Sequence, residues 1–281
     1  MNNLLAKEFS KKIRLETSKM LLKRGFGHLG GSFSIIETLS VLYGFTMKIR
    51  PENPSWDERD WFVLSKGHAG PALYATLALK GYFPMAWLMT LNDNGTHLPS
   101  HPDRLKTPGI DCTTGSLGQG ISQAVGIAKS FKMDEKENRV YTIVGDGELN
   151  EGQVWEAIQF AAHHKLDNLI VFIDENHKQL DGFTKDILNP FDIRLKLESF
   201  GFNAIRIKGD DESLIKQTID KCISIKNQPS AIVLDTIKGQ GIKYFEELYD
   251  NHHIRFTGES EVELRKMILT LEEELLSEVK I

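Results

Sequence analysis

Short apolar runs alternate with longer amphipathic segments along most of this 281-residue chain. The runs at 140–144 and 169–173 are rich in β-branched residues, which is typical of strands buried on both faces of a parallel sheet. Between them, residues 151–165 carry apolar side chains at helical spacing and predict the helix that connects the two strands. The same alternation predicts strands at 61–64, 204–207 and 231–236 and helices at 4–22, 69–79, 118–131, 192–200 and 212–225.

Two more helices are predicted from local sequence. One begins at Ser34, because Ser34 and Glu37 have the Ser-x-x-Glu spacing of a capping box. The other ends the chain, where apolar residues near helical spacing indicate core or subunit contacts rather than a cofactor element. These residues are Val262, Ile268, Leu271, Leu275 and Val279.

This alternation predicts one α/β domain over residues 1–281, with a doubly wound, mainly parallel sheet and helices on both of its faces. A chain of this length can bury a sizeable core, and its sequence has no internal repeat or low-complexity linker. Ligands of such sheets bind at the carboxyl edge of the strands. The residues that follow each strand are therefore the first candidates for a site.

Asp146 and Asn176 each follow one of the two apolar runs. Asp146 lies in the segment Gly145-Asp146-Gly147-Glu148, and Asn176 lies thirty residues further along the chain. If the two strands are neighbours, a carboxylate and an amide oxygen meet at the carboxyl edge of the sheet. Mg²⁺ prefers a few hard oxygen ligands from the protein together with phosphate and water oxygens. The spacing therefore predicts a magnesium site that also holds a diphosphate.

A glycine-rich turn at residues 113–120 leads into the predicted helix at 118–131. It is either a tight turn and nothing more, or a place where missing side chains let a flat ring or a diphosphate approach the backbone. The residues alone leave both interpretations open. The turn is not a Gly-x-Gly-x-x-Gly fingerprint, and the chain has no Gly-x4-Gly-Lys-Ser/Thr motif, so nucleotide binding is disfavoured.

Several histidines lie in short, loop-like segments, which suits recognition of phosphate and hydroxyl groups because imidazole donates hydrogen bonds and relays protons near neutral pH. These are His28, His68, His101, and His252 with its neighbour His253. The His-x-x-x-His and His-Glu-x-x-His spacings are absent, so a zinc hydrolase is a poor interpretation.

The remaining histidines carry weaker expectations. We expect His97 to lie in a loop near the site, and His163 and His164, late in a helix, to be structural. His177 follows Asn176 directly, and the sequence leaves its role open.

Composition and charge exclude other classes. The formal net charge is −5 and the basic residues are scattered, so no nucleic-acid partner is expected. The N-terminus lacks a cleavable apolar segment, and no apolar run approaches the roughly 18 residues of a membrane span, so we expect a cytoplasmic protein that does not enter a membrane. Cys112 and Cys222 are isolated and are interpreted as small buried hydrophobic residues.

The Gly-Asp-Gly segment and the later Asn resemble the signature of thiamine-diphosphate enzymes, with Glu175 in place of the first residue of the usual Asn pair. Together with Gly27-His28, Ser65-Lys66-Gly67-His68, the glycine-rich turn and His252-His253, the chain resembles the diphosphate-binding part of a transketolase along nearly its whole length. The resemblance implies the cofactors thiamine diphosphate and Mg²⁺.

Residue roles follow from this resemblance, position by position. It implies that Asp146, Asn176 and the main-chain oxygen of Lys178 bind the metal, and that His28, His68, His101, Glu151 and His252 take part in catalysis. His68 and His252 match histidines at the diphosphate, whereas His28 and His101 match histidines at the sugar end, and Glu151 matches an acid in a carboxylate relay between subunits. The implied cofactor-binding residues are His68, Gly115, Ser116, Leu117, Gly145, Asp146, Gly147, Glu148, Asn176, Lys178 and His252.

Two departures from the family pattern affect these assignments. His28 is followed by Leu29 rather than by proline, as in the short, split members of the family. Asn251 precedes His252 and His253 where a tryptophan is common, so the histidine that faces the diphosphate is not fixed by the sequence.

Full-length transketolases continue into a pyrimidine-binding domain and a C-terminal domain, and the resemblance implies that both are absent from this chain. The resemblance therefore implies a partner, a C-terminal transketolase subunit whose pyrimidine domain supplies the activating glutamate, in a heterotetramer of two plus two chains. The implied reaction moves a two-carbon ketol unit from a ketose phosphate to an aldose phosphate. The alternatives are the α subunit of a 2-oxo acid dehydrogenase and a non-catalytic regulatory subunit with the same fold. The sequence does not indicate the donor sugar.

Overall fold

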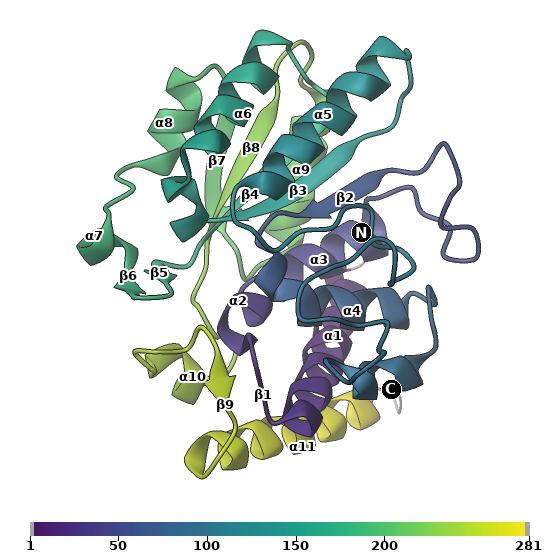
Figure 1. Cartoon of the computed structure of the whole chain (residues 1–281), viewed down its shortest axis with the longest axis vertical. Helices are drawn as coiled ribbons and strands as arrows, with labels where there is room; N and C mark the ends of the chain where they lie inside the picture. The colour runs from purple at the N-terminus through teal and green to yellow at the C-terminus, as the bar shows by residue number, and fades with distance from the viewer. Residues whose placement is uncertain (1–2, 279–281) are drawn as a thin grey trace.

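A five-stranded parallel sheet forms the centre of the structure, a computed structural model that describes residues 3–278. The strand order is β2-β3-β4-β8-β7 (Figure 1). The strands are β2 (Trp61–Leu64), β3 (Val140–Gly145), β4 (Leu169–Glu175), β7 (Asn203–Lys208) and β8 (Ser230–Asp235). All five predicted strands are present, and the predicted α/β fold with a parallel sheet is confirmed.

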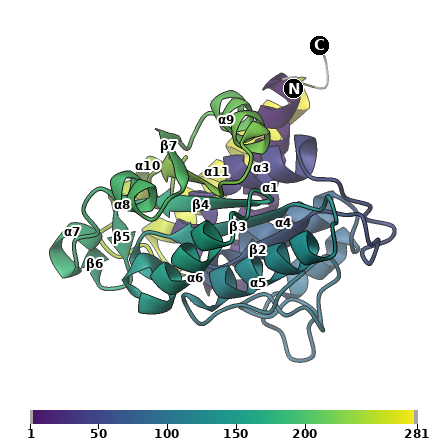
Figure 2. The same cartoon turned by 90° about the horizontal axis from the view of Figure 1, so that it is seen from above.

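Helices cover both faces of the sheet, as Figure 2 shows from above. Side chains of β4 alternate between the faces: Leu169, Val171 and Ile173 join one core, whereas Ile170 and Phe172 join the other. The first core is closed by α5 (Gln119–Met133), α6 (Gly152–His163) and α8 (Ile193–Ser199). The second is closed by α1 (Asn3–Arg24), α3 (Ile36–Phe45), α4 (Gly70–Leu79) and α9 (Glu212–Ser224). Double coverage explains the uninterrupted apolar runs of the central strands.

The predicted long helices agree with the structure to within a few residues, but several short elements carry no periodic signal and were not predicted. These are the helices α2 (Leu29–Phe33), α7 (Thr184–Ile187) and α10 (Lys243–Glu247), the 3-10 turns η1 (Gly67–Ala69), η2 (Met85–Thr90) and η3 (Gly147–Asn150), and the strands β1 (Phe26–Gly27), β5 (Lys178–Gln179), β6 (Gly182–Phe183) and β9 (Ile254–Arg255). Most of them lie next to residues that were predicted to form the site.

The predicted capping box at Ser34 is wrong. Helix α3 begins at Ile36, and Ser34 Oγ instead donates to the carboxylate of Asp174 at 2.7 Å. Glu37 pairs with Arg14 at 2.5 Å. Both side chains are buried, so they satisfy distant polar groups that have no access to water, and this requirement outweighs a local cap.

The ribbon formed by β1 and β9 joins the two ends of the chain. Gly27 pairs with Ile254, and this register brings His28 close to His252 and His253. The last helix, α11 (Glu259–Glu278), packs against α1, with Ile268 and Leu271 buried.

Three smaller expectations can also be compared with the structure. Val262 of α11 is about half exposed and Leu275 is partly buried, while Val279 lies outside the described residues. Cys112 and Cys222 are buried and free, as expected. Within residues 3–278, every helix is too short or too polar to cross a membrane.

Two glycines of α5 provide a matched test of this packing. A Cβ atom on Gly120 would lie 2.5 Å from Ser65 Cα, whereas a Cβ on Gly126 would meet nothing within 4 Å. We expect Gly120→Ala to lower the free energy of unfolding by about 1–3 kcal/mol through overpacking. Gly126→Ala should raise it by about 0.5–1 kcal/mol, because alanine favours the helix. Denaturant unfolding of both variants measures the difference, and equal effects would contradict the close contact between α5 and β2.

Candidate active site

The residues predicted to form the site gather around one cavity of about 430 Å³ at the carboxyl edge of the sheet. Gly145 and Asp174 are paired in the register of β3 and β4, so the segments that follow these strands lie side by side. Thirteen of the fourteen predicted site residues line the cavity. They are His28, His68, His101, Gly115, Leu117, Gly145, Asp146, Gly147, Glu148, Glu151, Asn176, Lys178 and His252. The fourteenth, Ser116, is exposed and does not line it.

Asp146 and Asn176 lie on the same side of this cavity. The carboxylate of Asp146 is buried and accepts hydrogen bonds from the backbone amides of Gly147 at 2.8 Å and His177 at 2.6 Å. Burial and, to a smaller extent, the negative charge of Asp174 raise the pKa of Asp146 to about 7. Lys238 acts on this carboxylate only from a distance, and among the described residues no basic side chain forms an ion pair with it. A divalent cation would provide the missing positive charge.

The amide of Asn176 has a fixed orientation. Its Nδ2 donates to Asp174 at 2.7 Å, and its Oδ1 accepts from the backbone amide of Lys178 at 3.2 Å. Among residues 3–278 there is no group of three or more His, Cys, Asp or Glu side chains that could hold a metal. A cation bound beside Asp146 would therefore need ligands other than a cluster of such side chains, and the amide oxygen of Asn176 is one within the same cavity.

The histidines form a cluster around His28. The ring of His28 lies 5.6 Å from that of His68, 5.7 Å from His101 and 5.3 Å from His252, between centroids. Burial lowers the pKa of His28 to about 4 and of His252 to about 3, and neighbouring lysines and histidines add to the effect. The pKa of His68 is also well below its ordinary value, mainly through burial. All three rings are therefore neutral at pH 7 and can donate one N–H each.

The structure distinguishes His252 from His253. His252 lines the cavity, and its Nδ1 lies 3.1 Å from Lys238 Nζ. His253 is exposed and packs against Phe26 and His28 outside the cavity lining. His252 is thus the member of the pair that can reach a ligand in the cavity.

Two buried lysines of the cavity were missed in the sequence. Lys66 forms an ion pair with Asp174 at 2.5 Å. Lys238 Nζ donates to the main-chain oxygens of Lys178 at 3.2 Å and Gln179 at 3.4 Å, and it has no carboxylate partner within the described part of the chain. Burial lowers the pKa of Lys238 to about 8, with a contribution from the charge of Lys66. Lys66 comes two residues after β2 and Lys238 three residues after β8, and this position near the carboxyl ends of strands is the signal that could have identified them.

The glycine-rich turn is held against the sheet by Glu148. This buried carboxylate accepts hydrogen bonds from Ser65 Oγ at 2.5 Å, Gly118 N at 2.8 Å and Gly145 N at 3.0 Å. Glu148 lines the cavity, but its oxygens are already used to fix the turn. The fixed turn brings Gly115 against the ring of His101, where an added Cβ would lie 3.2 Å away.

Glu151 lies at the rim of the cavity and is exposed. It is the N-cap residue of α6, but its side chain makes no capping hydrogen bond. Its carboxylate is therefore available to a group outside this chain.

The side chains of the other histidines do not line the cavity. His97 stacks on Trp87 with ring centroids 4.2 Å apart and is not part of the cavity lining. His163 and His164 end α6. His177 contributes its backbone amide to Asp146, while its exposed ring lies 3.6 Å from Asp235 Oδ1.

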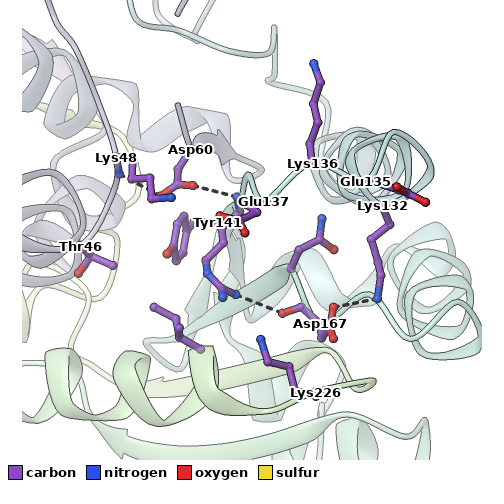
Figure 3. A pocket seen from close by; sticks show the side chains of 13 residues that line it. Thr46, Lys48, Asp60, Lys132, Glu135, Lys136, Glu137, Tyr141, Asp167 and Lys226 are labelled. Atoms are coloured by element: carbon purple, nitrogen blue, oxygen red, sulfur yellow. Dashed lines mark hydrogen bonds and ion pairs between the residues drawn. The ribbon is translucent and has the colours of Figure 1, made fainter. Parts of the chain in front are cut away.

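A second cavity, of about 610 Å³, lies at the opposite edge of the sheet, where β3 and β4 begin (Figure 3). Lys132 and Lys226 lie at or just beyond the carboxyl ends of α5 and α9, where basic side chains favour the helix dipole. Lys132 also pairs with Asp167 at 2.8 Å. The positions of Lys132 and Lys226 are thus explained by the helix ends next to them, and none of the predicted site residues lines this cavity.

Comparisons with known proteins agree with this geometry. Residues 5–279 match the family described as transketolase, thiamine diphosphate binding domain. The chain is 50% identical over 248 residues to the 6-deoxy-6-sulfo-D-fructose transketolase subunit SqwG of Clostridium sp. (strain MSTE9), covering 88% of this chain and 90% of that protein. It is 36% identical over 244 residues to an apulose-4-phosphate transketolase subunit of Phocaeicola vulgatus, covering 87% and 86%.

A solved structure agrees with the fold. The crystal structure of transketolase from Campylobacter jejuni superposes with a TM-score of 0.88 at 29% identity and covers 95% of this chain. The match includes only 43% of the Campylobacter chain, so the present chain spans less than half of that transketolase.

The role of Glu148 can be tested without any ligand. We expect Glu148→Gln to lower the free energy of unfolding by about 1–3 kcal/mol, because one buried donor loses its acceptor. Glu156→Gln, an exposed change on α6, is the matched control and should have little effect. Denaturant unfolding measures both. Unchanged stability of Glu148→Gln, with loss of cofactor affinity only, would show that Glu148 is a ligand rather than a support for the turn.

Proposed function

Because this chain belongs to the transketolase family, we propose that it is the diphosphate- and metal-binding subunit of a two-chain transketolase. The complete enzyme transfers a two-carbon ketol unit from a ketose phosphate to an aldose phosphate. The family match favours this function over the α subunit of a 2-oxo acid dehydrogenase. We assign the whole chain, residues 1–281, to one thiamine diphosphate-binding domain.

One observation carries the proposal: two buried ammonium groups, those of Lys66 and Lys238, share a cavity with the buried carboxylate of Asp146. An unpaired buried cation is costly. A diphosphate would supply the negative charge that Lys238 lacks, and His68 and His252 would donate neutral N–H groups to it. The cavity thus suits an anion and a cation bound together.

Magnesium would bind the side-chain oxygens of Asp146 and Asn176 and the main-chain oxygen of Lys178, together with diphosphate oxygens. The oxygen of Lys178 now accepts a hydrogen bond from Lys238 Nζ, so metal binding at that oxygen requires the ammonium group to shift. A diphosphate would offer that group a new partner. Thiamine diphosphate, when bound, supplies the chemistry that takes up and releases the two-carbon unit.

The remaining cavity residues suit the rest of the cofactor and the sugar. Gly115 and Leu117 would lie beside the aminopyrimidine, and Gly145 and Gly147 leave space for the diphosphate. His28 and His101 would contact the oxygens of the donor sugar and assist proton transfer there, since both are neutral donors or acceptors near pH 7.

A second polypeptide would complete this site. Relatives of similar length are named as transketolase subunits, and the present chain spans less than half of a full transketolase. The partner would carry the pyrimidine domain and its activating glutamate, and two copies of each chain would form a heterotetramer with two sites. The exposed carboxylate of Glu151 would face this partner.

The donor sugar requires a direct assay. The two similar proteins are named for different donors, 6-deoxy-6-sulfo-D-fructose and apulose 4-phosphate. A panel of ordinary, branched and sulfonated ketoses, offered to the reconstituted pair of chains, would identify the donor class.

The two-chain proposal is tested by reconstitution. We expect the purified chain to bind thiamine diphosphate and Mg²⁺ weakly and to transfer no ketol groups. Addition of the partner should tighten cofactor binding, since the pyrimidine ring becomes buried, and should start turnover. Calorimetry and a ketol-transfer assay measure both effects. Turnover of about 1 s⁻¹ or faster by this chain alone would contradict the proposal.

The division between the histidines gives a second test in the reconstituted enzyme. His68→Ala should weaken cofactor binding by about 1.5–3 kcal/mol, the usual effect of losing a hydrogen bond to a charged group. His101→Ala should leave cofactor affinity unchanged and lower kcat/KM for the donor. Cofactor titration and steady-state kinetics separate the two outcomes. If both variants lose cofactor affinity equally, the assigned sugar end is wrong.

A further inference from the structure

Asp174 is fully buried at the end of β4 and lies behind the cavity rather than in its lining. Its Oδ2 accepts hydrogen bonds from Lys66 Nζ at 2.5 Å, Ser34 Oγ at 2.7 Å and Asn176 Nδ2 at 2.7 Å. Its Oδ1 accepts one from Thr236 Oγ1 at 2.6 Å. One carboxylate therefore joins the ends of β2, β4 and β8 to the segment before α3.

We propose that Asp174 is a positioning residue that determines which end of the Asn176 amide faces the metal. A carboxylate can only accept hydrogen bonds, so the amide nitrogen of Asn176 must face Asp174 and the amide oxygen must face away from it. The proposal rests on the proposed function, because it concerns the ligand set assigned there.

The surroundings of Asn176 make this orientation necessary. Its Oδ1 accepts a hydrogen bond from the backbone amide of Lys178, at 3.2 Å. If the amide were reversed, its nitrogen would face both that N–H and the cation, and neither can accept a hydrogen bond. Groups that orient metal ligands in this way affect metal affinity by about 10–100-fold in other proteins.

A purely structural ion pair between Lys66 and Asp174 would predict something different. In that case the loss of any hydrogen bond to Asp174 would lower the stability of the protein, and the metal affinity of each variant would fall in proportion to its loss of stability. Ser34 and Thr236 donate to the same carboxylate, but their hydroxyl groups form no hydrogen bond with Asn176 and neither residue lines the cavity. They therefore provide matched controls for the effect of Asp174 on stability alone.

The experiment uses the complex of this chain with its partner and measures Mg²⁺ and Mn²⁺ affinity in the presence of thiamine diphosphate, together with the unfolding midpoint. We expect Asp174→Asn to weaken the affinity for both ions by about 10–100-fold. An amide at position 174 can donate to Asn176 Oδ1 and so turn it away from the cation. Ser34→Ala and Thr236→Val should lower the unfolding midpoint but leave both affinities within about threefold of the unchanged protein.

The exchange variant, Asp174→Asn with Asn176→Asp, provides a second test, in which the orientation of the side chain at position 176 no longer decides what the cation meets. A carboxylate at position 176 presents an oxygen to the cation in either orientation, and the pair keeps its net charge. We expect metal affinity within about threefold of the unchanged protein. Affinity weaker by about tenfold or more in the exchange variant would overturn the proposal, as would normal affinity in Asp174→Asn.

The same titration separates this proposal from the function on which it rests. Asp146→Ala should abolish Mg²⁺-dependent cofactor binding, because the cation then loses its only carboxylate ligand. If the unchanged complex shows no Mg²⁺-dependent binding, or if Asp146→Ala binds normally, the proposed metal site is wrong and the role of Asp174 falls with it. A different outcome would overturn the positioning role alone: the unchanged complex shows Mg²⁺-dependent binding, Asp146→Ala loses it, and Asp174→Asn keeps the metal affinity of the unchanged complex.

Discussion

The buried ion pair between Lys66 and Asp174 is the interaction on which the carboxyl edge of the sheet depends. Removing two charges from water is expensive, and their attraction offsets the cost only where further hydrogen bonds satisfy both groups. Here Ser34, Thr236 and Asn176 supply those bonds. Burial alone would raise the pKa of Asp174, but Lys66, Thr236 and Ser34 lower it overall, so the carboxylate stays ionised. The ends of three strands are thereby fixed relative to one another.

The charges that remain unbalanced lie on the cavity side of this pair. Asp146 has a raised pKa and Lys238 a lowered one, and both shifts arise first from burial. The two groups do not neutralise each other through a direct contact, because Lys238 is bonded to main-chain oxygens and Asp146 to main-chain amides. A divalent cation would compensate the negative charge of Asp146, and a diphosphate bound with it would compensate the positive charge of Lys238. The histidines around it are neutral and can donate without adding positive charge.

The sequence predicted the parts of this arrangement that follow from strong periodicity. Strands 140–144 and 169–173 are apolar because both faces of the sheet are covered, and Asp146 and Asn176 follow them in the register expected of neighbours. The features that the sequence did not predict depend on contacts between distant segments. The ribbon of β1 and β9, which brings His28 close to His252, has only two residues in each strand, too few to show an alternation of apolar and polar residues. Ser34 has the local pattern of a cap but bonds to a residue 140 positions away.

A contact between distant segments also compensates for a departure from the family pattern, the presence of Glu175 where an asparagine is usual. Glu175 is buried beside the proposed metal ligand, and a lone carboxylate there would repel the anionic ligand and lower local stability. Arg206 on β7 pairs with it and neutralises the charge. Neither Glu175 nor Arg206 lines the cavity, so this ion pair lies outside the proposed site. The residues proposed to anchor the diphosphate and the metal thus all belong to this chain, and the exposed carboxylate of Glu151 lines the same cavity, where the proposed partner could reach it.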